Sequence, residues 1–447
     1  MPEFESMIKS VVNSQMVRLA ILGILTVVML IPIFMIGGLV SERQSRSQEA
    51  IAEVSAKWGQ AQSINGPALV LPYVVQRTEV ASTGEKTLRT ETRNAIFLPK
   101  QLGAEGRIES EARARGIFQV PVYRLDLTLS GEFGPPNLAD LDIELGAVQW
   151  DRAHVAVGIS DVRAIREQSN LALNERQSPF LPGTGGFAEG GAGIHAMVDG
   201  ATAKSGFKFS FPLALNGSLS MYVGPFAEQT VLHLTSNSPY PNFQGNWLPD
   251  ERTISATGFD SIWRVSYLGR NYPQAWISNG DMQKAISASR FGVELTDPVD
   301  HYRMAERSVK YAGLFILLTF ASIWLMEVLA GVRVHPIQYL MVGAALCVFY
   351  LLELSLSEHI QFSLAYAIAS LSIIAMIAAY GRVILRGKGR SAVVAGGVSA
   401  LYGYLFVLLT NEDGALLVGS ISLFLILGAI MYVTRHIDWH GKQAVEQ

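Results

Sequence analysis

The chain carries a run of 22 residues without a charged side chain, at positions 19–40. In a helix each residue rises about 1.5 Å, so this run covers the roughly 30 Å of a bilayer's hydrocarbon core. The apolar region of a cleavable signal peptide is only about 7–15 residues long. We therefore interpret residues 1–40 as a short N-terminus followed by an uncleaved transmembrane helix.

Five further apolar runs follow in the last third of the chain, at 311–326, 336–356, 360–381, 391–410 and 414–434. Lipid offers no partner for backbone polar groups, so runs without strand-like alternation must form helices there. The sequence therefore predicts six transmembrane helices, one N-terminal and five C-terminal. It divides into an anchor at 1–40, an exported domain at 41–310, and a five-helix bundle with a short tail at 311–447.

The exported segment has the pattern of strands. Apolar Tyr123, Leu125, Leu127 and Leu129 alternate with polar residues, which is typical of a half-buried strand. Glycine- and proline-rich breaks separate this stretch from several similar ones. The prediction is an α+β membrane protein whose large β-rich domain, an antiparallel sandwich or pair of sheets, is inserted between transmembrane helices 1 and 2.

Both ends of the exported segment have helical features. Residues 41–58 continue the first helix, with Glu53 four positions before Lys57, and Gly59 is a plausible end. Residues 298–310 lead into the second helix, with Asp297 as the expected N-cap. We hypothesise that these segments are two rigid stalks that lift the β-rich domain off the bilayer.

The short C-terminal loops indicate the orientation. Two of them, at 357–359 and 411–413, contain no lysine or arginine. Basic residues resist translocation and collect on the cytoplasmic side of a membrane. The alternate loops and the tail carry them at Arg333, Arg382, Arg386, Lys388, Arg390, Arg435 and Lys442. The expectation is a multi-pass membrane protein with both termini in the cytoplasm and the β-rich domain on the opposite side of the membrane.

Composition and missing motifs exclude several activities. The net charge of −3 disfavours a nucleic-acid partner, and the lone Cys347 excludes a disulfide framework or a thiolate zinc site. No Walker A, HExxH or GxSxG motif occurs. We therefore expect no catalytic residue, no cofactor, no metal and no nucleotide.

An aromatic and basic cluster in the exported segment has two interpretations. It could be a recognition surface for a lipid, glycan or protein of the envelope, because aromatic residues and arginine form binding hot spots. The more ordinary interpretation, which we favour, is the core and edge of a β-sandwich. The candidates for this surface are Trp247, Trp263, Arg264, Tyr267, Arg270 and Trp276.

Two further groups belong to the membrane part. A basic collar above the outer face of the bilayer would bind lipid headgroups or dock an anionic partner. Its candidates are Arg43, Arg46, Arg303, Arg307 and Lys310. Glu327 and Glu353 are candidate intramembrane polar residues, which are costly in lipid. Glu353 could serve a proton relay, or could be a protonated or near-interfacial side chain, and Glu327 fits an interfacial position.

Several long strings resemble the CreD family of bacterial inner-membrane proteins, which is linked to envelope integrity and induced by the CreBC two-component system. The resemblance is carried by residues 240–276, by FGVELTDPVDHYRMAERSVKYAGLFILLTF at 291–320, by LSEHIQFSLAYAIASL at 356–371 and by GPALVLPY at 66–73. It covers nearly the whole chain. The resemblance implies an inner-membrane location and a periplasmic β-rich domain, and it implies no reaction or catalytic residue.

These observations favour a non-enzymatic envelope-integrity or stress-response protein whose periplasmic domain binds or senses an envelope component. The lipid bilayer is one partner, and an envelope lipid, glycan or protein is a possible second. The alternatives are a transport or mechanotransmission subunit that handles a lipid or amphipathic molecule, and an enzyme that modifies the envelope.

Overall fold

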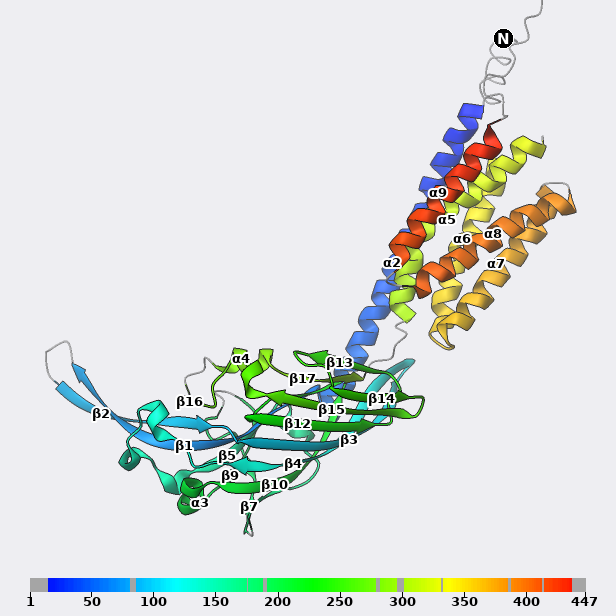
Figure 1. Cartoon of the computed structure of the whole chain (residues 1–447). Coiled ribbons are helices and arrows are strands. Elements are labelled where there is room, and N and C mark those ends of the chain that lie inside the picture. The colour runs from blue at the N-terminus through cyan, green and yellow to red at the C-terminus, as the bar shows by residue number, and fades with distance from the viewer. Residues whose placement is uncertain are drawn as a thin grey trace, which may run out of the picture. The chain divides into compact units, whose positions relative to one another are not determined.

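The computed structural model describes residues 15–80, 86–174, 176–187, 191–278, 282–295, 301–330, 333–384, 387–411 and 414–435 (Figure 1). The chain divides into two compact units. A helical unit contains Met1–Ser47 and Val299–Gln447, and a β unit contains Gln48–Pro298. Each unit has its own hydrophobic core.

The helical unit confirms the predicted helices. They are α2 (Gln15–Trp58), α5 (His301–Ala330), α6 (Pro336–Ser357), α7 (Phe362–Ile384), α8 (Lys388–Thr410) and α9 (Ala415–Thr434). Among the described residues, five helices are long and apolar enough to cross a membrane, and α9 contributes a further described apolar stretch at Ala415–Ala429. Fold class and helix order therefore agree with the sequence prediction.

Local signals fix where these helices begin and how closely they pack. His335 caps α6: its Nδ1 accepts the N–H of Ile337 at 3.3 Å, and the Gln338 side chain accepts the N–H of His335 at 2.9 Å. These bonds satisfy donors that have no partner at a helix start. Further along α6, a Cβ at Gly343 would lie 2.8 Å from the sulfur of Met29. Glycine is therefore what lets α6 approach α2.

The first helix does continue past the apolar run, as predicted, and ends at Trp58. Lys57 and Glu53 form the expected pair at 2.8 Å. Gly59 has a φ of +151°, and a Cβ there would lie 2.7 Å from the carbonyl oxygen of Asn216. The second segment is helical from His301, while residues 296–300, with the expected N-cap, lie outside the described part of the chain. The role of these segments as stalks stays a prediction.

The β unit contains two sheets. The first has the order β13-β17-β11-β1-β5-β9-β8, with β2 pairing β1 and β16, and the second has the order β14-β15-β12-β3-β4-β10-β6-β7. The bounds of the first sheet are β1 (Gln62–Val80), β2 (Lys86–Phe97), β5 (His154–Ile159), β8 (Leu181–Pro182), β9 (Gly193–Met197), β11 (Ser220–Val223), β13 (Pro241–Gly245), β16 (Ala275–Ile277) and β17 (Phe291–Leu295).

The second sheet contains β3 (Gln101–Arg115), β4 (Phe118–Phe133), β6 (Asn170–Leu173), β7 (Arg176–Pro179), β10 (Phe207–Ser218), β12 (Gln229–Ser236), β14 (Glu251–Ser255) and β15 (Gly258–Ser266). Most pairings are antiparallel, as predicted. Two are parallel, β1 with β11 and β12 with β3, so both sheets are mixed. Short helices α3 (Gly200–Ser205) and α4 (Met282–Ala288) complete the unit.

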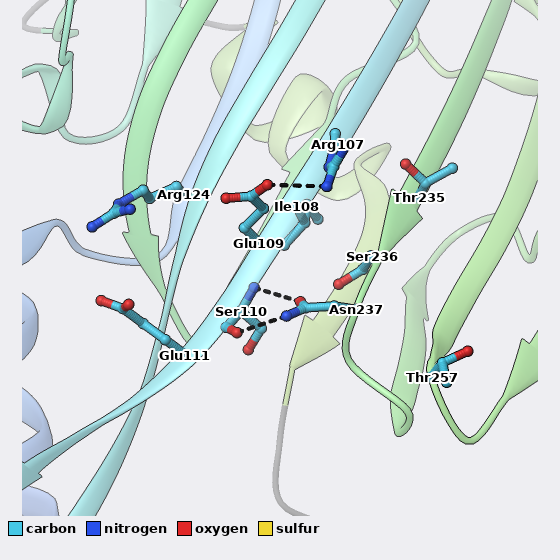
Figure 2. A pocket seen from close by; sticks show the side chains of 10 residues that line it. All are labelled: Arg107, Ile108, Glu109, Ser110, Glu111, Arg124, Thr235, Ser236, Asn237 and Thr257. Carbon is cyan, nitrogen blue, oxygen red and sulfur yellow. Dashed lines mark hydrogen bonds and ion pairs between the residues drawn. The ribbon is translucent and has the colours of Figure 1, made fainter.

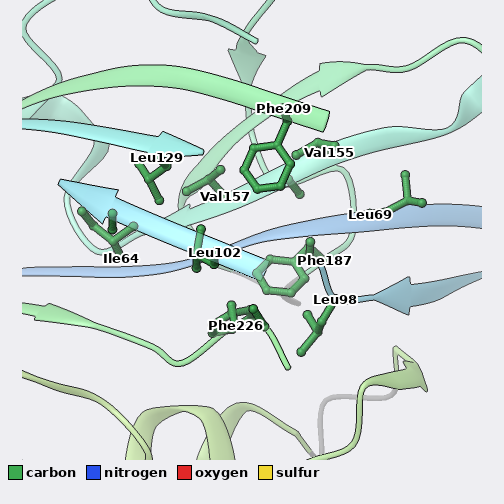
Figure 3. Packing of buried hydrophobic residues seen from close by; sticks show 14 of the residues in the cluster. Ile64, Leu69, Leu98, Leu102, Leu129, Val155, Val157, Phe187, Phe209 and Phe226 are labelled. Carbon is green, nitrogen blue, oxygen red and sulfur yellow. The ribbon is translucent and has the colours of Figure 1, made fainter. Parts of the chain in front are cut away.

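One core lies between the two sheets. In β4, Tyr123, Leu125, Leu127 and Leu129 are buried and the polar residues between them are exposed, as the alternating pattern predicts. Figure 3 shows Leu129 in the same cluster as residues of β1, β5 and β10. The polar candidates for function therefore lie at the edges of this core and on the outer faces of the sheets.

Candidate functional site

The predicted aromatic and basic surface is largely part of the core, so its interpretation as one surface is wrong. Trp263 is 0%, Trp276 6% and Arg270 7% exposed. Trp247 packs against the same core and is half-buried. The cause is the alternation of β15, which directs Trp263 inward.

Two members of that cluster do face solvent. Arg264 points outward from β15 and pairs with Glu251 at 2.8 Å, and Tyr267 is 43% exposed in the turn after β15. Arg264 and Tyr267 remain candidates for a contact surface, whereas the buried Trp263, Arg270 and Trp276 do not.

Arg270 holds a loop together from inside the β unit. Its guanidinium donates to the carbonyl oxygens of Pro225 at 2.8 Å, Ala227 at 3.1 Å and Tyr272 at 3.2 Å, and also to Gln274. Burial lowers the pKa of the Arg270 guanidinium. The Pro225 carbonyl has a second donor in the Tyr272 hydroxyl, but those of Ala227 and Tyr272 would lose this donor without Arg270, which is costly in a buried loop. The residue is therefore a structural clamp.

The predicted basic collar is largely matched by acceptors within the helical unit. Nε of Arg43 lies 3.7 Å from Oε1 of Glu358, which also accepts the Tyr302 hydroxyl at 3.0 Å. Arg46 pairs with Glu42 at 2.7 Å. Both collar residues of α2 therefore have an acidic partner within the helical unit.

The α5 members of the collar are similar. Lys310 pairs with Glu306 at 2.8 Å, and Arg307 donates to the carbonyl oxygen of Leu408 at 2.9 Å. Arg303 is exposed. Contact of this collar with headgroups or an anionic partner stays a proposal.

Glu327 is buried in a three-helix contact, not simply at an interface. One oxygen pairs with Arg18 of α2, and the other accepts the Tyr339 hydroxyl of α6 at 3.0 Å. Both carboxylate oxygens thus have partners, as a buried charge requires. The arrangement ties α2, α5 and α6 together at this level.

Glu353 is more isolated. It is 1% exposed, its Oε2 accepts the Ser308 hydroxyl at 2.7 Å, and its Oε1 has no hydrogen-bond partner in the described part of the chain. Tyr350, on the same helix, and Tyr366, on α7, are also buried in the core of the helical unit. An unpaired carboxylate would be costly at such a place, so the geometry fits the neutral acid.

Two of the hollows on the described part of the β unit bear on function, and neither was predicted from the sequence. The smaller, which we call the Arg290 pocket, has a volume of about 260 Å³ and lies among β1, β5 and α4. Polar groups surround a single aromatic ring. The side chains that line the pocket include Ser63, Asn65, Phe187, Gln283, Ser287 and Arg290.

Arg290 is the charged group of this pocket. Its guanidinium carbon lies 4.7 Å from the ring centroid of Tyr222. The Tyr222 hydroxyl donates to Glu294 at 2.9 Å, and burial together with that carboxylate raises the pKa of Tyr222 to about 12. Within the described ranges, no carboxylate lies within ion-pair distance of Arg290. Arg290 is thus an exposed residue that lines the polar hollow and whose guanidinium lies over an aromatic ring.

The larger hollow, which we call the Asn237 groove, has a volume of about 510 Å³ and lies where β12 ends beside β3 (Figure 2). Asn237 bonds to both backbone groups of Ser110: its Oδ1 accepts the N–H at 2.7 Å and its Nδ2 donates to the carbonyl oxygen at 3.1 Å. Arg107 and Glu109 pair at 3.2 Å along the same strand. The groove offers charges of both signs and backbone groups.

The described residues contain no group of three or more histidine, cysteine, aspartate or glutamate side chains arranged to hold a metal ion. Sequence reasoning missed both hollows because each is assembled from distant segments. Only the run of hydroxyl and amide residues around α4, including Gln283 and Ser287, could have pointed to the Arg290 pocket.

Comparison with known proteins agrees with the described architecture. Residues 14–440 match the family described as Inner membrane protein CreD. The chain is 33% identical over 420 residues to the Inner membrane protein CreD of Escherichia coli strain K12, covering 92% of this chain and 91% of that protein.

Among solved structures, an M1 zinc metallopeptidase from Deinococcus radiodurans aligns with 78% of this chain and 96% of its own, at 8% identity. Its TM-score of 0.22 is too low to carry any argument about fold or activity. The sequence match, by contrast, spans nearly the whole chain and confirms the resemblance. The chain belongs to the CreD family of inner membrane proteins, with several membrane-spanning helices.

Proposed function

We propose that this protein is a non-enzymatic inner-membrane protein. Its β unit lies in the periplasm and binds a polar, acidic component of the cell envelope. The proposed site is the Arg290 pocket. The family gives the membrane and envelope setting. The pocket supplies the chemistry of the ligand.

The proposal rests on one observation, an arginine at a concave polar pocket that has no carboxylate partner among the residues that the structure describes. Arginine binds carboxylate groups through two parallel hydrogen bonds. Asn65, Gln283 and Ser287 add amide and hydroxyl groups, which suit the hydroxyls and amides of a sugar. The volume of about 260 Å³ is just below that of pockets for drug-sized molecules, so one sugar ring or one short acidic stem fits.

The periplasmic position of the β unit is supported by the loops of the helical unit. Arg382 and Lys388 lie on either side of the connection between α7 and α8, while the connection between α6 and α7 carries no lysine or arginine. Basic loops stay in the cytoplasm. Both termini then lie in the cytoplasm, and the β unit, which follows the odd-numbered first crossing, lies outside.

The test uses the full chain in lipid nanodiscs and soluble peptidoglycan fragments, whose sugars carry amides and whose peptide stems carry carboxylates. We expect saturable binding by calorimetry. The Arg290→Ala variant should lose at least about tenfold in affinity, as expected for loss of a charge-assisted bidentate contact. Arg252→Ala removes an exposed arginine of β14 outside the pocket and is the matched control.

Equal affinity of the Arg290→Ala variant and the wild type would show that the fragments bind elsewhere. Absence of any binding to the wild type would refute the acidic glycan ligand. A Gln283→Ala variant adds an independent check, because it changes a pocket amide without altering charge. Loss of affinity in both pocket variants, with Arg252→Ala unchanged, supports the proposal.

A further inference from the structure

Strand β3 extends beyond the neighbour that covers one of its edges. β12 runs parallel to β3 and ends at Ser236, which pairs with Ile108. On the other side, β4 accompanies β3 to its last residue, where Arg115 pairs with Phe118. In the part of the chain that the structure describes, no strand lies beside the second edge of β3 after Ile108.

The backbone groups of this edge have known directions. Both the N–H and the C=O of Ser110 bond to the side chain of Asn237, so they point toward the uncovered edge (Figure 2). Residues two positions apart in a strand point their backbone groups the same way. Ala112 and Ala114 therefore present N–H and C=O groups at this edge, and both residues are exposed.

The charged side chains of this stretch follow a particular order. Glu109, Glu111, Arg113 and Arg115 alternate with small residues, so all four lie on one face of the strand. Along the chain the order is acid, acid, base, base. When a second copy of this stretch runs antiparallel to the first, each acidic residue can face a basic one.

From this order we propose that the uncovered edge of β3 pairs with the same edge of a second copy of the protein, antiparallel and centred on Ala112. Glu111 then faces Arg113 of the second copy, and Glu109 faces its Arg115. Ala112 faces its own counterpart, and each such pair exchanges two main-chain hydrogen bonds. The second sheet becomes continuous across the two copies.

The charge order selects this register over its neighbours. With the centre at Ala112 all four charged residues face an opposite charge, whereas a centre at Glu111 or Arg113 places that residue opposite its own copy, and like charges destabilise a strand pair. A parallel pairing in register does the same along the whole stretch. Charges alone are a common protection of exposed edges, but protection does not require a self-complementary order. The order is what identifies a second copy as the occupant.

Present partners of these side chains do not prevent the exchange. Arg113 pairs with Glu111 at 2.9 Å and lies over the Trp58 ring of α2, 3.5 Å from its centroid. Arg115 pairs with Glu53 of α2 at 2.9 Å, and the side chains of the two ion pairs are about 40–58% exposed. Exposed pairs contribute little to stability and exchange readily. When a second strand pairs with this edge, its backbone replaces the Asn237 side chain as the hydrogen-bond partner of Ser110. The Asn237 groove, of about 510 Å³, provides space beside this edge.

Anchorage favours the contact. Two copies held in one bilayer by their helices meet at a far higher effective concentration than free molecules. A short strand pair, too weak for a soluble dimer, can therefore be populated in the membrane. This inference concerns a different surface from the Arg290 pocket and does not depend on ligand binding.

The test is disulfide formation in native membranes by the full chain. In the proposed pair the two Ala112 Cα atoms are about 5.5 Å apart, within the range that a disulfide spans. An Ala112→Cys variant should form a covalent dimer under mild oxidation. Gln119→Cys, an equally exposed position on β4 away from the edge, is the matched control and should not. The native Cys347 is buried in the helical unit.

Charge reversal then tests the register. In the Ala112→Cys background, Glu111→Arg or Arg113→Glu should each reduce dimer formation several-fold, because each places like charges opposite. The double variant carrying both changes restores the complement and should recover the dimer. No dimer from Ala112→Cys, equal dimer from Gln119→Cys, or a double variant no better than the singles would overturn the proposal. A disulfide to another protein would also overturn it, by assigning the edge to a different partner.

Discussion

The arginine clamp of the β unit gives a stability prediction that can be worked out from its contacts. In an Arg270→Leu variant, the carbonyl oxygens of Ala227 and Tyr272 lose the guanidinium that bonds to them. Pro225 loses one of two donors, because its carbonyl oxygen still accepts the Tyr272 hydroxyl at 3.0 Å. The variant therefore leaves two carbonyl groups of a buried loop without their donor.

Each such group costs roughly 1–3 kcal/mol, and removal of a buried charge returns part of that cost. We expect the free energy of unfolding of the β unit to fall by about 3 kcal/mol. The assay is proteolysis of the full chain in nanodiscs over a urea series, with the β-unit fragment followed on a gel. Arg264→Leu, an exposed arginine of β15 with a 51% exposed side chain, should cost less than about 1 kcal/mol.

An equal midpoint for the Arg270→Leu and Arg264→Leu variants would refute the reasoning. It would mean that the loop carbonyls find other donors at little cost. Arg270→Lys separates charge from geometry, because lysine keeps the charge but cannot reproduce the planar set of donors. We expect it to recover only part of the loss.

Three further predictions concern pH, helix packing and topology. Burial lowers the pKa of His154, so the unfolded chain binds the proton more readily than the folded one. As the pH falls below about 6.5, the free energy of unfolding should decrease by at most about 1.4 kcal/mol per pH unit. Urea titrations should show that His154→Gln flattens this slope. Gly343→Leu should lower the thermal midpoint of the helical unit, because its Cβ would lie 2.8 Å from a methionine sulfur, whereas Gly396→Leu, with no atom within 4 Å, should not. A membrane-impermeant maleimide should label Thr253→Cys but spare Arg390→Cys in cells with a permeabilised outer membrane, and the reverse pattern would invert the topology.

Much of the fold was predictable because its signals are local. A run without charge, such as that at 19–40, has to be helical in lipid whatever surrounds it. The alternation in β4 likewise determines which side chains are buried. Gly59 ends its helix at the predicted place because its φ of +151° suits glycine.

The candidate site was less predictable for a physical reason. Arg18 and Glu327 pair although 309 positions separate them in the sequence, and nothing local to either residue indicates the other. The Arg290 pocket depends in the same way on how β1 and β5 meet α4. The burial of Trp263, in contrast, could have been read from the chain, because Phe259, Trp263 and Val265 share one face of β15.

The parallel pairing of β3 with β12 has a consequence for biosynthesis. β3 cannot pair with β12 until β12 has been synthesised, because Gln101 of β3 pairs with Gln229 of β12. β17 joins β11 to β13 and is the last strand before α5. The nascent chain therefore stays largely open, with apolar strands uncovered, until the ribosome has almost reached the second crossing. Quality-control proteases and holding chaperones thus have a long interval in which to act, and truncations that remove β17 should leave a product that they degrade.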